Sequence, residues 1–219
     1  MTIIIGAIHD GEVFIGADSL WSWSNNFVRE MKTDKFLAIE NTDVMIAGSG
    51  EERLSQVFTE MLNEKSNRYL LEIETKEDVI ALAKELHSEV GESGVGPPKD
   101  NEMPDHNMGF LLARKGYSKL WLLDSDYTVT EFDDYVCIGA GGELGECAMK
   151  ALSKCDIHGK QAVLKAIESV NDCHPYCGGR IDLRTLEGSS DEEDEEGEEE
   201  EEDSEKPKPK PKKKRKKKK

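Results

Sequence analysis

Long apolar runs are missing from this chain of 219 residues. A membrane-spanning helix needs about 20 consecutive apolar residues, so we expect no membrane segment. The early apolar stretch at residues 3–8 is followed by His9, Asp10 and Glu12 and has no basic lead-in, so we expect no secretory signal. A phosphate-binding loop of the Gly-x-x-x-x-Gly-Lys-Ser/Thr type is also absent, which excludes ATP hydrolysis by that means.

The chain also has no second pair of closely spaced cysteines. Its five cysteines are odd in number, and the pair Cys173 and Cys177 flanks His174. A structural zinc site needs four ligands in paired spacings, so zinc is not expected. Reduced thiols in the cytoplasm are the simplest interpretation, and we expect a cytoplasmic protein.

Positive charge is in short supply, because 46 Asp and Glu outweigh 29 Lys and Arg and give a formal net charge of -17. Residues 191–205 are nearly all acidic, and residues 206–219 are all Lys, Arg or Pro. Such runs cannot bury a face, which predicts one folded domain at 1–187 and a disordered tail at 188–219. The acidic folded part argues against broad nucleic-acid binding. The basic end of the tail leaves nucleic-acid binding or a nuclear location as an alternative.

The start of the chain carries a strong hairpin pattern. Asp10-Gly11 separates two apolar runs, at residues 3–8 and 12–17, as a two-residue turn requires. That register makes Asp18 a near neighbour of Thr2. Because side chains alternate along a strand, Thr2 and Asp18 point to opposite faces, and a bend or a bridging residue must connect them if they cooperate.

Apolar periodicity places the remaining elements. Ser49 and Glu52 fit a capping box at the start of one helix, and a second helix begins near Thr75. The order favours an α+β fold in which two stacked antiparallel sheets lie between two helix layers, a four-layer αββα sandwich. Strands are expected at 35–39, 44–47, 108–114, 120–123, 128–132, 135–139 and 180–186, later helices at 144–152 and 162–170, and a loop at 91–107.

Thr2 is a candidate catalytic residue on chemical grounds alone. Its small side chain favours removal of Met1, which leaves a threonine with a free amine. An N-terminal amine has an ordinary pKa of about 7.7–8.0 and acts as a base near neutral pH. One residue then supplies both the nucleophilic hydroxyl and the base that activates it.

Several segments, taken in order, resemble proteasome β-type subunits and most closely the HslV-type bacterial peptidase. The resemblance extends from Thr2 to about Glu187 and implies an N-terminal nucleophile hydrolase with an αββα sandwich. The matching segments are Thr2 to Gly6, Asp10-Gly11, Ile15 to Ser19, Lys35, Ala47 to Gly50, Ile138 to Gly142 and Asp172 to Gly179.

The resemblance implies roles for individual residues. Thr2 would be the nucleophile, with its own amine as general base. Asp18 matches the acidic residue that orients a catalytic lysine. Lys35 matches that lysine, and Lys32 is the alternative for the same role.

Further positions follow from the same resemblance. Gly48 would offer its backbone N–H to the oxyanion, and Asp172 belongs to the implied catalytic set. Backbone carbonyls of Asn171, His174 and Cys177 match positions that hold a monovalent cation such as Na+. No cofactor is otherwise expected to be required.

Some positions bear on activity and specificity. Ala140, between Gly139 and Gly141, stands where the family usually has a serine that helps to organise the amine. Trp21 and Met31 lie near positions that line the substrate pocket in the family.

The resemblance implies a threonine-type endopeptidase that acts on proteins and peptides inside a homo-oligomeric ring. Because the sequence has no phosphate-binding loop, an ATP-dependent unfoldase would be a separate partner. The alternative, motivated by Ala140, is a catalytically weak family member that serves as a scaffold or binding subunit.

Overall fold

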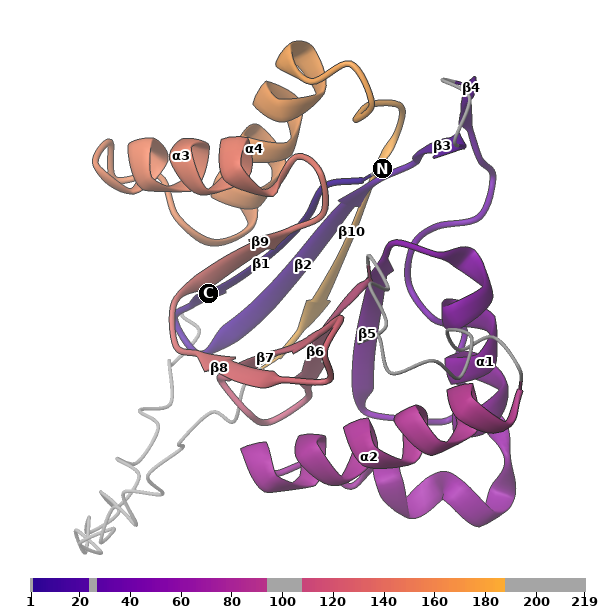
Figure 1. Ribbon diagram of the computed structural model, residues 1–219. Coiled ribbons are helices and arrows are strands. Elements are labelled where there is room, and N and C mark those ends of the chain that lie inside the picture. The colour runs from indigo at the N-terminus through magenta and orange to yellow at the C-terminus, as the bar shows by residue number, and fades with distance from the viewer. Residues whose placement is uncertain (1, 24–26, 94–107, 188–219) are drawn as a thin grey trace, which may run out of the picture.

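Two antiparallel sheets, each covered by helices, form the part of the chain that the computed structural model describes, residues 2–23, 27–93 and 108–187 (Figure 1). Met1, part of the predicted loop and the predicted tail lie outside the described residues. None of the helices in the described ranges has both the length and the apolar character of a membrane-crossing segment.

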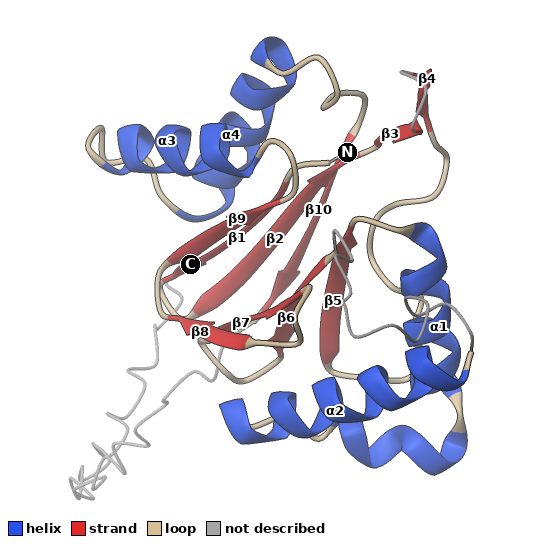
Figure 2. Cartoon of the chain, in the orientation of Figure 1, coloured by secondary structure: helices blue, strands red, loops and turns tan. Residues whose placement is uncertain are grey.

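Each sheet has four strands, and Figure 2 shows them as two red layers between blue helices. The first sheet has the order β10-β2-β1-β9 and the second has the order β5-β6-β7-β8. The first comprises β1 (Ile4–His9), β2 (Glu12–Asp18), β9 (Tyr135–Ile138) and β10 (Ile181–Leu186), and the second β5 (Val44–Ser49), β6 (Gly109–Arg114), β7 (Leu120–Asp124) and β8 (Val129–Phe132).

The helices lie on the outer faces of the two sheets (Figure 1). A separate hairpin, β3 (Leu20–Trp23) and β4 (Phe27–Glu30), extends from the end of β2. The helices are α1 (Glu52–Asn63), a 3-10 helix η1 (Lys65–Leu71) and α2 (Lys76–Glu92) on the second sheet, and α3 (Gly142–Ser153) and α4 (Gly159–Cys173) on the first.

Three hydrophobic clusters fill the spaces between the layers. Alternation along residues 3–5 sends Ile3 and Ile5 toward α3 and α4, and Ile4 toward the second sheet. The third cluster, which includes Phe58 and Trp121, lies between the second sheet and α1 and α2. Three apolar interfaces stacked in this way make the predicted αββα sandwich, so that prediction is confirmed.

The opening hairpin also follows the sequence pattern. His9 pairs with Glu12 across the turn, as a two-residue loop predicts. The Asp18 N–H donates to the Ile3 carbonyl at 3.2 Å, which continues the register to the end of the hairpin. Thr2 therefore lies at the same end of the sheet as Asp18.

Two local predictions differ from the structure. Residues 35–39 do not form a strand, because a single bridge joins Phe36 to Ala47 and the Ile39 N–H turns back to the Leu37 carbonyl. The predicted capping box at Ser49 is wrong, because Ser49 is the last residue of β5. Helix α1 begins later, and Glu51 caps it without a side-chain hydrogen bond.

The predicted start of the second helix near Thr75 is confirmed, and a capping box lies there. Thr75 is the N-cap of α2, where its side chain accepts from the Asp78 N–H and the Asp78 carboxylate accepts from the Thr75 N–H. Neither η1 nor the hairpin of β3 and β4 was expected from the sequence.

A glycine in β2 allows α4 to lie directly on the first sheet. A Cβ atom at Gly16 would lie 2.7 Å from Ile167 Cδ1 and 2.7 Å from Val163 Cγ1, both of them buried. Such contacts are closer than packed carbon atoms tolerate, so the layers would have to separate.

Gly16→Ala should therefore lower the free energy of unfolding by about 1–3 kcal/mol, the usual cost of overpacking. Gly91→Ala is the matched control, because a Cβ atom at Gly91 meets nothing within 4 Å. That change should leave stability unaltered or raise it by up to about 1 kcal/mol. Urea unfolding of both variants at one protein concentration tests the difference, and equal stabilities would contradict the packing argument.

Candidate active site

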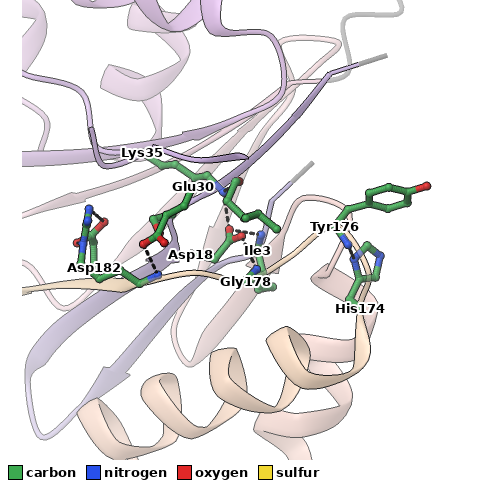
Figure 3. A network of polar contacts seen from close by, with 11 residues as sticks. Ile3, Asp18, Glu30, Lys35, His174, Tyr176, Gly178 and Asp182 are labelled. Carbon is green, nitrogen blue, oxygen red and sulfur yellow. Dashed lines mark hydrogen bonds and ion pairs between the residues drawn. The ribbon is translucent and has the colours of Figure 1, made fainter. Parts of the chain in front are cut away.

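The polar network at the end of the hairpin centres on the carboxylate of Asp18, which is fully buried (Figure 3). Asp18 Oδ1 accepts from Lys35 Nζ at 2.5 Å and from the Ile3 N–H at 2.9 Å. Asp18 Oδ2 accepts from the Gly178 N–H at 3.0 Å. A buried charge needs such partners, and these three donors come from segments that are distant in sequence.

Lys35 is the cationic partner in this network. Its side chain is 3% exposed, and its ammonium also donates to the Leu20 carbonyl at 2.9 Å. Burial lowers the pKa of Lys35, and the Asp18 carboxylate opposes that shift. Lys32 is exposed, so the structure brings Lys35 rather than Lys32 to Asp18.

Thr2 is held by the loop that follows β9. The Gly141 N–H donates to the Thr2 carbonyl at 3.1 Å. Gly139 has a φ of +87°, and a Cβ atom there would lie 2.4 Å from the Thr2 carbonyl oxygen, so this position requires glycine. The alanine at position 140 is exposed. The loop thus fixes the backbone of Thr2 through glycine contacts.

Thr2 and Asp18 are connected through the backbone. Thr2 is 4% exposed and precedes Ile3, whose N–H binds the same Asp18 oxygen as the Lys35 ammonium. The sequence required a bend or a bridging residue between Thr2 and Asp18. The structure provides a direct bond from Asp18 to the peptide unit that links Thr2 to Ile3.

Gly48 does not present a free donor. Its N–H donates to the Lys35 carbonyl at 2.9 Å, next to the bridge that joins Phe36 to Ala47. An N–H group has one hydrogen, so an oxyanion at this site would have to share or replace the bond to Lys35. The predicted role of Gly48 therefore requires a change from the arrangement seen here.

The segment after α4 reaches Asp18 through Gly178, not through Asp172. Asp172 is exposed in the last turn of α4, and within the described ranges it has no hydrogen bond or ion pair to Thr2, Asp18 or Lys35. Its predicted place in the catalytic set has no support in this geometry.

The three residues with predicted cation-binding carbonyls lie in the same segment. The His174 carbonyl accepts from the Cys177 N–H at 3.2 Å. Asn171 Oδ1 is buried without a hydrogen-bond partner in the described part of the chain. Burial, followed by the Asp18 charge, raises the pKa of the Cys177 thiol to about 12, so the thiol stays neutral at physiological pH. In the same ranges, no three His, Cys, Asp or Glu side chains are placed to hold a metal ion.

Sequence reasoning missed an outer ring of contacts. Glu30 Oε1 accepts from Ser19 Oγ and from the Arg180 N–H, both at 3.1 Å, and so joins the β3–β4 hairpin to the start of β10 (Figure 3). The consecutive glycines Gly178 and Gly179 were the available signal, because Gly179 has a φ of +78° and lets the chain pass close to Ser19.

A cleft of about 280 Å³ opens beside this network, between residues 33–38 and α1. Lys35 and Gly48 both line it, as does Trp21. Met31 is not among the lining residues, so one of the two pocket positions suggested by the resemblance reaches the cleft.

The sequence model of proteasome subunits matches residues 2–185, which span nearly all of the described part. The chain belongs to the proteasome subunit family. A search of curated protein sequences finds no significant match.

Solved structures show the same fold at low sequence identity. "Thiobacillus denitrificans BPH" gives a TM-score of 0.69 at 17% identity and covers 86% of this chain and 100% of that one. The complex of that protein with epoxomicin gives a TM-score of 0.68 at 16% identity and covers 85% of this chain and 99% of that one. Eukaryotic HslV from Trypanosoma brucei gives a TM-score of 0.64 at 19% identity and covers 84% of this chain and 99% of that one. The family assignment and the αββα sandwich thus agree.

Removal of one member of the buried ion pair should destabilise the fold, because the other member is left buried without its partner. We expect Lys35→Met to lower the free energy of unfolding by about 3–5 kcal/mol, because Asp18 is left charged and buried without its cation. The double variant Lys35→Met/Asp18→Asn should be more stable than the sum of the single effects predicts. A double-mutant cycle by urea unfolding measures this coupling. Additive effects would show that the pair does not act as a unit.

Proposed function

We propose that this proteasome-family subunit is a threonine-type endopeptidase that uses Thr2 as its nucleophile after removal of Met1. The observation that carries the proposal is the Asp18 carboxylate, which binds both the Lys35 ammonium and the backbone N–H that follows Thr2. A buried ion pair at this position places a fixed positive charge close to the residue whose amine would act as base.

The residues support a self-activated attack. Thr2 Oγ attacks the peptide carbonyl while the Thr2 amine takes its proton, directly or through a water molecule. The Lys35 charge disfavours a protonated amine and keeps the base available, and Asp18 fixes the position of Lys35. The amine then protonates the leaving group, and water hydrolyses the resulting ester. When Gly48 exchanges its bond to the Lys35 carbonyl for the oxyanion, it supplies a donor whose loss typically costs about 3–4 kcal/mol of barrier.

We also propose the assembly that such a site requires. Unrestricted peptide hydrolysis would damage other proteins, so the site is expected to lie inside a homo-oligomeric ring of proteasome-like subunits in the cytoplasm. Protein substrates would be delivered by a separate ATP-dependent unfoldase. No membrane partner is proposed.

A second candidate is a weakly active or inactive subunit that serves as a scaffold or binding protein. The observation that favours it is the Gly48 N–H, which already donates to the Lys35 carbonyl. The alanine at position 140 also favours this candidate, because it has no hydroxyl to assist the amine.

The nucleophile is tested by Thr2→Ala in the full chain. Hydrolysis of fluorogenic peptides should fall by roughly a thousandfold or more, as removal of a nucleophile does in serine proteases. Thr2→Ser keeps a hydroxyl and should retain measurable activity. Intact mass must show that Met1 has been removed in all the proteins compared. Equal rates for wild type and Thr2→Ala would exclude this mechanism, and a retained Met1 without activity would favour the scaffold.

The proposed base and the buried ion pair together predict a bell-shaped dependence of kcat/KM on pH. Activity rises as the Thr2 amine loses its proton, with an apparent pKa at or below about 7.7–8.0 because the Lys35 charge favours the neutral amine. Activity falls when Lys35 loses its proton, because the buried Asp18 carboxylate is then left without the cation that holds the site together. Because burial lowers the pKa of Lys35, this second limb should lie below the ordinary lysine value of about 10.4. Steady-state rates between pH 6 and 11, in the range where circular dichroism shows a folded protein, measure both limbs. Activity that stays constant up to pH 11 would contradict the need for a charged Lys35.

A further inference from the structure

We propose that the cleft beside Lys35 and Gly48 binds a basic side chain, so that this enzyme prefers lysine or arginine on the acyl side of the bond it cleaves. The inference rests on the proposed function and deepens it. Its starting point is the position of the cleft, which shares Lys35 and Gly48 with the candidate active site. A side chain that enters the cleft therefore belongs to a peptide lying at that site.

The two walls of the cleft differ in chemistry. One wall is largely apolar and includes Trp21, Phe36 and Leu37. The other is a strip of α1 without an apolar side chain, made of Glu52, Ser55, Gln56, Thr59 and Glu60. Lysine and arginine have the same division, because an apolar stem carries a charged head.

The helical repeat explains the polar wall. Residues four apart lie on one face of a helix, so Glu52, Gln56 and Glu60 form one row and Ser55 and Thr59 form the next. The outer row is exposed, whereas Ser55 and Thr59 are half-buried. Two carboxylates therefore stand at the rim, where the charged head of a long side chain would arrive.

The net charge of the cleft is negative. Within the described ranges, neither Glu52 nor Glu60 takes part in an ion pair. Asp34, the third carboxylate of the lining, is paired with Arg184 at 2.6 Å. The one cation of the lining is Lys35, whose ammonium is bound to Asp18 and to the Leu20 carbonyl. The two rim glutamates are thus left to attract a positive charge.

The volume of the cleft and the unpaired Nε1 donor of Trp21 support binding of a peptide in the cleft. The volume of about 280 Å³ is below the range of about 300–1,000 Å³ typical of pockets for drug-sized ligands, which suits one side chain. Trp21 lines the cleft, and its Nε1 is buried without a hydrogen-bond partner in the described part of the chain. A carbonyl group of a bound peptide would satisfy this donor, and the indole ring attracts cations.

Substrates that differ in one charge test the preference. The peptides are acetyl-Ala-Ala-X with a fluorogenic amide leaving group, where X is lysine, norleucine or glutamate. Norleucine keeps the four-carbon stem of lysine without the ammonium. We expect kcat/KM for lysine to exceed that for norleucine by roughly three- to tenfold at low salt, as exposed charge pairs allow. The ratio should shrink in 1 M NaCl, where the Debye length is about 3 Å.

Variants of the rim identify the residues responsible. Glu52→Gln/Glu60→Gln should bring the ratio of lysine to norleucine close to one. Glu52→Lys/Glu60→Lys should favour the glutamate substrate instead. The matched control is Glu85→Gln/Glu89→Gln, which changes the net charge equally on exposed positions of α2 that do not line the cleft, and it should keep the wild-type ratio.

A binding measurement separates this inference from the proposed function. Fluorescently labelled acetyl-Ala-Ala-X amides are titrated against full-length Thr2→Ala, with and without the rim substitutions, and followed by anisotropy. Tighter binding of the lysine peptide that depends on Glu52 and Glu60 supports the cleft even if no peptide is hydrolysed. Equal binding and equal hydrolysis of the lysine and norleucine peptides would overturn the inference while leaving a Thr2-dependent peptidase intact.

Discussion

The buried ion pair between Asp18 and Lys35 is the constraint on which the site depends. Removing two charges from water is expensive, and the attraction between them repays it only when the remaining hydrogen-bond capacity is also satisfied. Here the carboxylate accepts from Lys35, Ile3 and Gly178. Those partners lie far apart in the sequence, so the pair can form only when the hairpin, the segment before β5 and the segment after α4 have all reached their places. Folding and assembly of the site are therefore coupled.

Close backbone approach is the second requirement, and it explains why glycines surround Thr2. Gly139 and Gly141 bring the loop after β9 against the Thr2 carbonyl, where a side chain at position 139 would collide with it. Gly178 differs, because a Cβ atom there would meet only Leu20 Cδ2, at 3.5 Å, and its N–H donates to Asp18. The sandwich itself mainly supplies rigid strand ends. The residues of the candidate site are then positioned by loops that meet at one end of the first sheet (Figure 1).

One backbone contact joins the candidate active site to the cleft beside it. The bond from the Gly48 N–H to the Lys35 carbonyl holds residues 33–38 beside β5, and that placement shapes the cleft between this segment and α1. The same bond occupies the donor that an oxyanion would need. Substrate binding and donor release are thus expected to be connected, because Lys35 and Gly48 both line the cleft that a peptide would enter. Activity in this family member would depend on how easily the Gly48 N–H exchanges the Lys35 carbonyl for the oxyanion.

The sequence by itself determined the elements whose stabilising interactions are local. The Asp10-Gly11 hairpin and the helix that begins near Thr75 depend on neighbours a few residues away, and the order of such strands and helices predicted the four layers. Only the tertiary structure shows that Lys35, not Lys32, reaches Asp18. It also shows that the Gly48 N–H donates to the Lys35 carbonyl and that Asp172 is exposed. It also created the hairpin of β3 and β4 and set the cleft beside Lys35. These features depend on contacts between segments distant in sequence, whose direction and spacing exist only after the layers have packed.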